Sequence, residues 1–205
     1  MGELLDYVSA YNLMKKYGIN SIESKYVKSA DEAIKFSKGR PIVLKGITKK
    51  AIHKTKSGLL ELDLLTSDQI KGAFLRLSKK AQKFKPYKIL AQPMTKQGIE
   101  IIMGGKVDSQ FGKMILLGLG GIYVETFKDF ALRVCPITRY DAKKMLEQLK
   151  SKKVIAPDQK SEKMIEEVLL KISKLLVENN IQELDLNPLI LHDGTYDAVD
   201  IRILK

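Results

Sequence analysis

The sequence ELDLNPLILHDGTYDAVDIRI, residues 183–203, carries the clearest folding signal in the chain. Asp193-Gly194 is a strong two-residue turn signal between runs of alternating apolar and polar residues. A turn at this position predicts an antiparallel hairpin in which His192 faces Thr195 and Asn187 faces Asp200. The two-residue period places polar side chains on one face and apolar side chains on the other. The expected polar face holds Glu183, Asp185, Asn187, Asp200 and Arg202; the expected apolar face holds Leu184, Leu186, Val199, Ile201 and Ile203.

The polar face of this hairpin suits a hard cation. Mg²⁺ takes oxygen ligands, usually one or two from the protein and the rest from water and nucleotide phosphates. Opposed side chains lie about 5 Å apart at their Cβ atoms, so Asn187 and Asp200 are the pair we expect to bind it. Asp185 and Arg202 are expected to form a cross-strand ion pair. The alternative is an exposed edge hairpin whose outer residues are polar without binding a metal.

The rest of the chain predicts two α+β lobes. Hydrophobic periodicity, helix caps and glycine or proline breaks indicate an alternation of helix and strand first, and then a strand-rich part covered by helices. Helices are expected at 3–17, 29–36, 66–84, 140–150 and 161–179, and strands at 26–27, 42–45, 59–62, 89–92, 98–107, 113–117 and 131–134. We expect lobes of residues 1–87 and 88–205 that meet at a cleft.

Charge is spread unevenly along the 205 residues, which carry a formal net charge of +12. Residues 1–100 contribute +11 of it and residues 101–205 only +1. A basic excess is compatible with nucleic-acid binding, with a solvated helix face, or with the phosphates of a small ligand. The densest cluster comprises Lys79, Lys80, Lys83, Lys85 and Lys88.

Composition excludes several classes of protein. One cysteine, Cys135, rules out an internal disulfide, and together with only two histidines it argues against an ordinary zinc site. No apolar run approaches the roughly 18 residues that cross a bilayer, and the N-terminus has no signal-peptide core. We therefore expect a cytoplasmic protein without a membrane partner.

Two further motifs are suited to binding phosphate. Lys45 is expected at the end of the apolar strand 42–45, where a lysine can enter a cleft as a compact positive charge or extend its ammonium into solvent. The run Gly118–Gly121 lets backbone N–H groups approach an anion, or it is a glycine-rich turn. It fits neither the Walker loop nor the dinucleotide fingerprint.

His53 lies in the basic segment AIHKTKSG, residues 51–58. Neighbouring lysines disfavour the protonated ring, and a neutral imidazole is a nucleophile near which cations can hold a phosphoryl group. The alternative is an ordinary surface histidine, which is also our interpretation of His192.

The chain resembles the ATP-grasp β subunit of ADP-forming acetyl-CoA synthetase, in the NDP-forming acyl-CoA synthetase family, with a more distant likeness to succinyl-CoA synthetase β chains. The resemblance spans nearly the whole sequence. It rests on KSADEA (28–33), PIVLK (41–45), IHK (52–54), QPM (92–94), GIEIIMGGKVDSQFGKMILLGLGGIYVETFKDFALRV (98–134), ELDLNPLI (183–190) and VDIRI (199–203). It implies an ATP-grasp fold with nucleotide held between two lobes.

The resemblance also implies roles for individual residues. Lys45 matches a lysine that meets nucleotide phosphates, and Gln92 and Met94 match the adenine-binding segment. Glu100 matches an acidic residue at the ribose, and Asn187 and Asp200 match the Mg²⁺ ligands. His53 matches a phosphoryl-relay histidine. Glu125 is expected to position that histidine or the metal, and Arg133 to meet phosphate.

The function that follows is phosphoryl transfer through phosphohistidine between ADP/ATP and a CoA-binding α subunit, since the chain shows no CoA-binding domain of its own. Two alternatives remain open at this point. One is an orphan or regulatory ATP-grasp module without the relay, and the other is a basic nucleic-acid-binding protein.

Overall fold

The structure, a computed structural model, describes residues 2–48, 58–121 and 129–205. The chain divides into two compact units, a larger one of residues 1–21 with 96–205 and a smaller one of residues 22–95. This grouping differs from the expected lobes because the first helix and the residues after it pack with the C-terminal strands. The division of the nucleotide-binding lobes at residue 87 stays a prediction.

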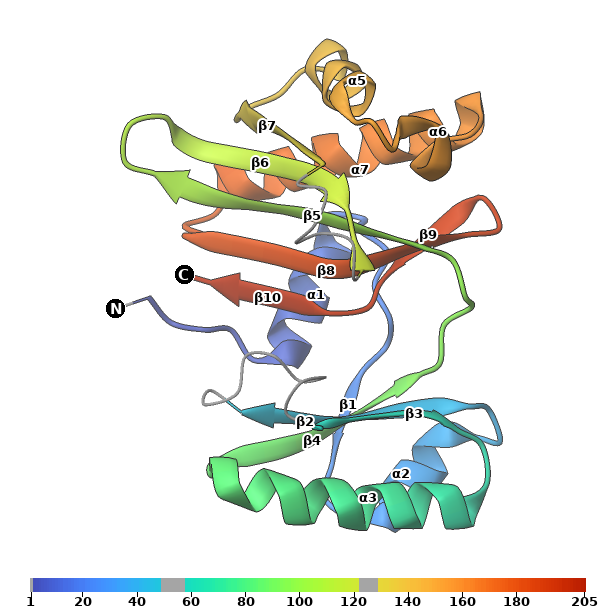
Figure 1. The fold of residues 1–205 in the computed structure, drawn as a ribbon. Helices are drawn as coiled ribbons and strands as arrows, with labels where there is room; N and C mark the ends of the chain where they lie inside the picture. Colours follow the sequence, from blue (N-terminus) through green and yellow to red (C-terminus); the bar gives the residue numbers. More distant parts are fainter. Residues whose placement is uncertain (1, 49–57, 122–128) are drawn as a thin grey trace. The chain divides into compact units, whose positions relative to one another are not determined.

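The smaller unit is a four-stranded antiparallel sheet with helices on one face (Figure 1). The strand order is β1-β4-β2-β3. Its elements are β1 (Lys25–Val27), α2 (Ala30–Ser37), β2 (Ile42–Thr48), β3 (Leu60–Leu64), α3 (Ser67–Ala81), the 3₁₀ helix η1 (Gln82–Phe84) and β4 (Tyr87–Pro93).

Local sequence explains where these helices begin. The Ser29 side chain accepts a hydrogen bond from the Glu32 backbone N–H at the start of α2, and Thr66 and Gln69 form a reciprocal capping box at the start of α3. Such caps satisfy backbone N–H groups that have no partner inside the helix. Side chains at helical spacing on α3 then pack against the sheet: Ile70, Ala73, Leu77 and Ala81.

The larger unit is built on a six-stranded sheet with the main path β10-β8-β5-β6-β7, to which β9 adds by pairing with β8. Its strands are β5 (Ile99–Asp108), β6 (Gly112–Leu119), β7 (Phe130–Val134), β8 (Glu183–His192), β9 (Thr195–Ala198) and β10 (Ile201–Leu204). Its helices are α1 (Tyr7–Lys16), α5 (Arg139–Gln148), α6 (Lys152–Ile155) and α7 (Gln159–Glu178).

The core of the larger unit lies between this sheet and helix α7, which runs along one of its faces (Figure 1). Alternate strand residues and one stripe of α7 are almost fully buried. They include Ile101, Met103, Ile115, Leu117, Leu184, Leu186, Leu169, Ile172 and Leu176. Within residues 2–48, 58–121 and 129–205, each expected helix and strand has a counterpart, and the short α6 is an addition to them.

The predicted register of the C-terminal hairpin is confirmed. His192 pairs with Thr195 across the turn, and Arg202 pairs with Asp185 further along. Asp193 and Gly194 have φ values of 46° and 70°, as a type I′ turn requires. Asp185 was the expected ion-pair partner of Arg202; the ion pair that the structure gives Arg202 is to Glu183, at 3.3 Å.

Lys113 caps the C-terminal end of helix α7. The Nζ of Lys113, on β6, donates hydrogen bonds to the carbonyl oxygens of Leu176 (2.6 Å), Val177 (3.2 Å) and Asn179 (2.8 Å). The last carbonyls of a helix have no partner within it, and a positive charge there is favoured by the helix dipole. Lys113 therefore fastens α7 to the sheet.

We predict that Lys113→Met lowers the free energy of unfolding by about 1–3 kcal/mol, because the carbonyls lose a charged hydrogen-bond donor. Urea denaturation measures the change. Lys163→Met, at an exposed lysine of α7, is the control and should stay within about 0.5 kcal/mol of the wild type. Equal stability of the two variants would contradict the capping role.

Candidate functional site

In the smaller unit, Lys45 and Gln92 share the face of the sheet that carries no helix. Gln92 pairs with Val43, two residues before Lys45, and the neighbouring positions Leu44 and Ala91 belong to the core beneath α2 and α3. Lys45 and Gln92 are 4% and 1% exposed. A lysine and an amide are thus held on one buried surface, an arrangement that can present a positive charge and a hydrogen-bonding group to a ligand.

The prediction that Lys45 ends its strand is wrong. Strand β2 continues to Thr48, and its pairing with β4 extends through Gly46, Ile47 and Thr48. The N–H of Gly46 donates to the carbonyl oxygen of Leu59 at 2.8 Å, so β2 stays hydrogen-bonded beyond Lys45. Lys45 therefore projects from the middle of a rigid strand.

The segment after Gln92 is fixed by contacts within the same unit. The Gln92 Nε2 donates to the hydroxyl of Ser24 at 2.8 Å, and the Met94 N–H donates to the carbonyl oxygen of Pro41, also at 2.8 Å. Ser24 was not identified from the sequence, since nothing in the sequence links two residues 68 positions apart.

In the larger unit, Glu100, Asn187 and Asp200 share the face of the sheet opposite α7. Ile101 and Leu186, the strand neighbours of Glu100 and Asn187, are buried on the helix side, and alternation turns the next residue outward. The Asn187 N–H donates to the carbonyl oxygen of Asp200 at 3.1 Å, which places the two residues opposite each other. This is the juxtaposition that the turn predicted.

The donor set of this pair fits Mg²⁺. Asn187 offers an amide oxygen and Asp200 a carboxylate oxygen, and Mg²⁺ binds through one or two such groups while keeping water and phosphate ligands. Over residues 2–48, 58–121 and 129–205, no group of three or more His, Cys, Asp or Glu side chains could hold a metal.

The glycine run packs against Glu100. The Gly120 N–H donates to the Glu100 carbonyl oxygen at 2.7 Å, and a Cβ at Gly120 would lie 2.8 Å from that carbonyl group. Gly121 has φ +74°, and a Cβ there would lie 3.1 Å from Glu100 Oε2. Glycine is required here because the backbone of the run approaches β5 too closely for a side chain.

Arg133 lies apart from these residues. It pairs with the buried Ile115 on the helix side of the sheet, and its Nη1 donates to Gln148 Oε1 of α5 at 2.9 Å. The structure does not bring Arg133 together with Glu100, Asn187 and Asp200.

Two of the predicted residues, His53 and Glu125, lie outside the described residues. The other histidine, His192, is mostly buried, and its Nε2 lies 2.8 Å from Asp197 Oδ2. Our interpretation of His192 as a surface histidine is therefore wrong, since its partner is a carboxylate on the paired strand β9.

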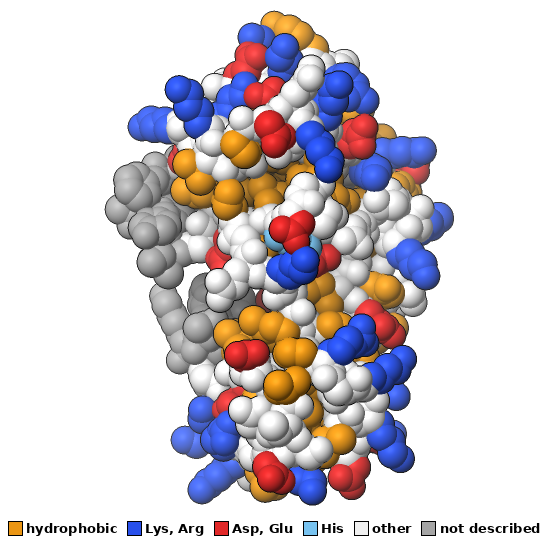
Figure 2. Space-filling view, turned by 90° about the vertical axis from the view of Figure 1, so that its right-hand side faces the viewer, with side chains coloured by type: hydrophobic (Ala, Val, Ile, Leu, Met, Phe, Trp, Pro, Cys, Tyr) orange, Lys and Arg blue, Asp and Glu red, His pale blue; other side chains and the backbone are white. Residues whose placement is uncertain are grey.

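The charged surface shows no single cationic patch on the side drawn in Figure 2, where Lys and Arg side chains alternate with acidic and apolar ones. The five lysines between 79 and 88 are exposed, and Lys88 lies 4.8 Å from the centre of the Tyr26 ring. In the part of the chain that is described, no helix combines the length and apolarity needed to cross a membrane.

The chain belongs to the ATP-grasp domain family, whose model matches residues 2–204. Among characterised relatives, it is 34% identical over 209 residues to the protein named acetate–CoA ligase [ADP-forming] II subunit beta of Pyrococcus furiosus, covering 95% of this chain and 89% of the relative. The corresponding subunit beta of ligase I from the same organism is 32% identical, with the same coverage.

The fold matches a solved structure of acetyl-coenzyme A synthetase 1 from Ca. Korarchaeum cryptofilum, described as a complex with coenzyme A and Ca-AMPCP. The TM-score is 0.90 at 30% identity, over 98% of this chain and 93% of that one. The α+β ATP-grasp fold and the family resemblance expected from the sequence are thereby confirmed.

We predict that Gly120→Ala destabilises the protein by about 2 kcal/mol, because the added Cβ overpacks the contact with the Glu100 backbone. Thermal unfolding measures the loss of stability. Calorimetric titration measures the loss of affinity for ADP that should accompany it. Gly72→Ala, in the interior of α3, is the control, and it should be neutral or stabilising since alanine favours helix. A Gly120→Ala protein as stable as the wild type would contradict the close approach.

Proposed function

We propose that this chain is the nucleotide-binding β subunit of an ADP-forming acyl-CoA synthetase, which passes a phosphoryl group between a partner subunit and ADP. The observation that carries the proposal is the confirmed register of the hairpin, which sets Asn187 opposite Asp200. Family membership supports the fold, and the register sets two side chains with Mg²⁺-type oxygen donors opposite each other, which supports a metal site at this pair.

The smaller unit would supply charge and hydrogen bonds to the nucleotide. The Lys45 ammonium is a compact positive charge that suits phosphate oxygens. Gln92 and Met94, fixed through Ser24 and Pro41, would line the adenine. In the larger unit, Glu100 would accept hydrogen bonds from the ribose.

Asn187 and Asp200 would hold the Mg²⁺ ion, which neutralises phosphate charge when bound. The lobes 1–87 and 88–205 would enclose the nucleotide. Arg133 is not assigned to phosphate, because its guanidinium contacts α5 on the other face of the sheet.

His53 would act as the nucleophile of the relay. A neutral imidazole nitrogen attacks phosphorus of an acyl phosphate, the bond from phosphorus to the acyl oxygen breaks, and the carboxylic acid leaves. Attack by the terminal phosphate oxygen of ADP on phosphohistidine then forms ATP and restores the ring. Glu125 would orient the imidazole.

The acyl phosphate must be made elsewhere, from acyl-CoA and inorganic phosphate with release of CoA. The relatives are named as β subunits, which supports a separate α subunit for this chain. We propose that the α subunit binds CoA and that the complex works in the cytoplasm. Nucleic acid is not part of this proposal.

We predict that Asn187→Ala and Asp200→Ala each remove most of the increase in ADP affinity that Mg²⁺ produces. Each substitution deletes one of the two protein oxygen ligands, so Mg-ADP should bind about tenfold more weakly. Calorimetric titration with ADP, with and without Mg²⁺, measures this. Asp108→Ala, at the aspartate that ends β5, should bind Mg-ADP as the wild type does. Unchanged Mg²⁺ dependence in both site variants would refute the metal site.

A second prediction concerns the relay. Incubation with Mg-ATP labelled at the γ-phosphate should transfer label to the protein, and the label should be acid-labile and alkali-stable, as phosphohistidine is. His53→Ala should remove it, whereas His192→Gln, at the only other histidine in the sequence, should retain it. A labelled His53→Ala protein would exclude His53 as the acceptor.

Salt-sensitive RNA or DNA binding without affinity for ADP would instead favour a nucleic-acid-binding protein.

A further inference from the structure

The residues immediately before Asp200 are held by the N-terminal part of the chain. The Tyr7 hydroxyl, on α1, donates to the carbonyl oxygen of Val199 at 2.6 Å. Tyr7 is only 5% exposed, so this hydrogen bond is made largely out of water, where an unpaired carbonyl would be costly. The peptide group that leads into Asp200 is therefore fixed from outside its own strand.

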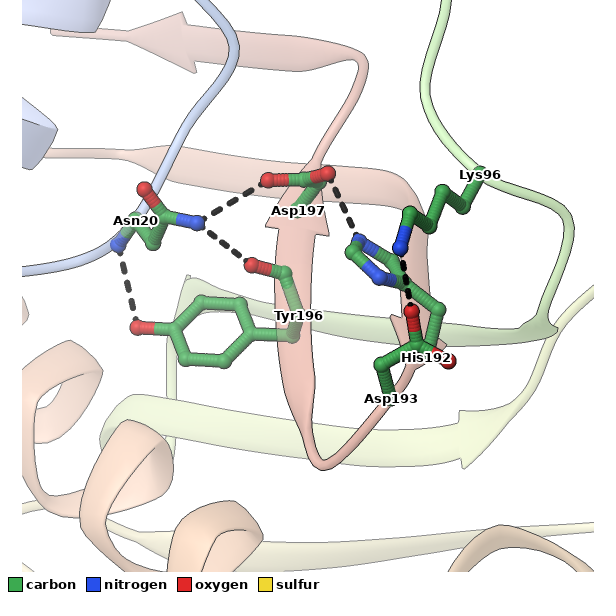
Figure 3. Close-up of polar contacts among 6 residues, drawn as sticks. All are labelled: Asn20, Lys96, His192, Asp193, Tyr196 and Asp197. Atoms are coloured by element: carbon green, nitrogen blue, oxygen red, sulfur yellow. Dashed lines mark hydrogen bonds and ion pairs between the residues drawn. The ribbon is translucent and has the colours of Figure 1, made fainter.

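Asn20 fixes the residues one step earlier. The Ala198 N–H donates to the Asn20 carbonyl oxygen at 3.1 Å, and the Asn20 Nδ2 donates to the carbonyl oxygen of Tyr196 at 2.6 Å and to Asp197 Oδ1 at 2.9 Å. Figure 3 shows Asn20 beside β9 with its amide directed at both groups.

The Tyr196 hydroxyl completes this contact by accepting the Asn20 N–H at 3.0 Å. Burial raises the pKa of Tyr196, so its hydroxyl is neutral at pH 7. Segment 196–199 is thus tied to Tyr7 and Asn20 through both backbone and side chains.

The strand pairing on the other side leaves Asp200 little freedom. Its carbonyl oxygen accepts from the Asn187 N–H, and the Val199 N–H donates to the carbonyl oxygen of Pro188 at 3.1 Å. Asp200 falls between β9 and β10, outside both strands. Hydrogen bonds from α1 and from residue 20 therefore replace the support that a continuous strand would give.

We propose that Tyr7 and Asn20 are positioning residues for Mg²⁺ binding, which act by fixing the backbone of residues 196–199 and thereby the direction of the Asp200 carboxylate. This inference rests on the proposed function, in which Asn187 and Asp200 are the metal ligands. Mutation of a group that is hydrogen-bonded to a metal ligand commonly lowers metal affinity by about ten- to a hundredfold. Tyr7 and Asn20 act on the ligand's backbone rather than on its carboxylate, so a smaller effect is expected.

The test is the Mg²⁺ concentration that gives half-maximal ADP binding. Tyr7→Phe removes only a hydroxyl and should raise this concentration about fivefold. ADP binding without Mg²⁺ should stay within about twofold of the wild type. In the metal-free protein, amide hydrogen exchange over residues 198–200 should accelerate. Asn20→Ala should give the same pattern.

Matched controls separate positioning from general stability. Tyr17→Phe removes a hydroxyl that donates to Glu178 at 2.8 Å, next to the opposite end of α1, and Asn12→Ala changes an exposed asparagine on the same helix. Both should keep the wild-type Mg²⁺ requirement even if their melting temperatures fall. If Tyr7→Phe or Asn20→Ala shows the Mg²⁺ requirement of its control, the proposal is overturned.

Asp200→Ala, measured in the same titration, distinguishes a failure of the proposed metal site from a failure of the positioning role of Tyr7 and Asn20. If it leaves the Mg²⁺ dependence intact, the metal site of the proposed function fails. If it removes the dependence while Tyr7→Phe and Asn20→Ala do not change it, only the positioning role fails. Should Tyr7→Phe show no cooperative unfolding, Asn20→Ala decides the outcome alone.

Discussion

The backbone pairing of β8 with the strands that follow it is the constraint on which the larger unit depends. β8 contacts β5 on one side and both β9 and β10 on the other, so its register sets which side chains face the helices and which face away. A slip of one residue would turn Leu184 and Leu186 out of the core and Asn187 into it. Burial of the apolar side chains therefore fixes the register that sets Asn187 opposite Asp200.

The smaller unit carries most of the chain's positive charge. Residues 22–95 contain 17 Lys and Arg against 6 Asp and Glu, a net +11 of the chain's +12. Lys45 is buried on the sheet face that carries no helix, whereas the lysines between 79 and 88 are exposed. Of these two arrangements, the buried Lys45 is the one that resembles a ligand-binding site. We interpret the second as a solvated face; Lys79 and Lys80 lie in the last turn of α3, where cations are favoured.

The sequence predicted what local rules govern. Asp193-Gly194 determined the turn, and the two-residue period then determined Asn187 opposite Asp200. It could not predict contacts between distant segments, such as Ser24 with Gln92 or Tyr7 with Val199, since no local pattern marks them. Lys45 was misplaced at a strand end because the apolar run stops there, whereas pairing with β4 continues β2 to Thr48. Arg133 was assigned to phosphate by resemblance, but strand alternation directs it toward α5.

The most direct test of the central claim is to locate the bound metal on this chain. Mn²⁺ can replace Mg²⁺ beside ADP, and its unpaired electrons broaden the NMR signals of nearby amides. With isotope-labelled protein, the account predicts broadening centred on residues 187 and 200, with weaker effects at Glu100 and Gly120. Broadening centred elsewhere, with the signals of residues 187 and 200 unchanged, would contradict it.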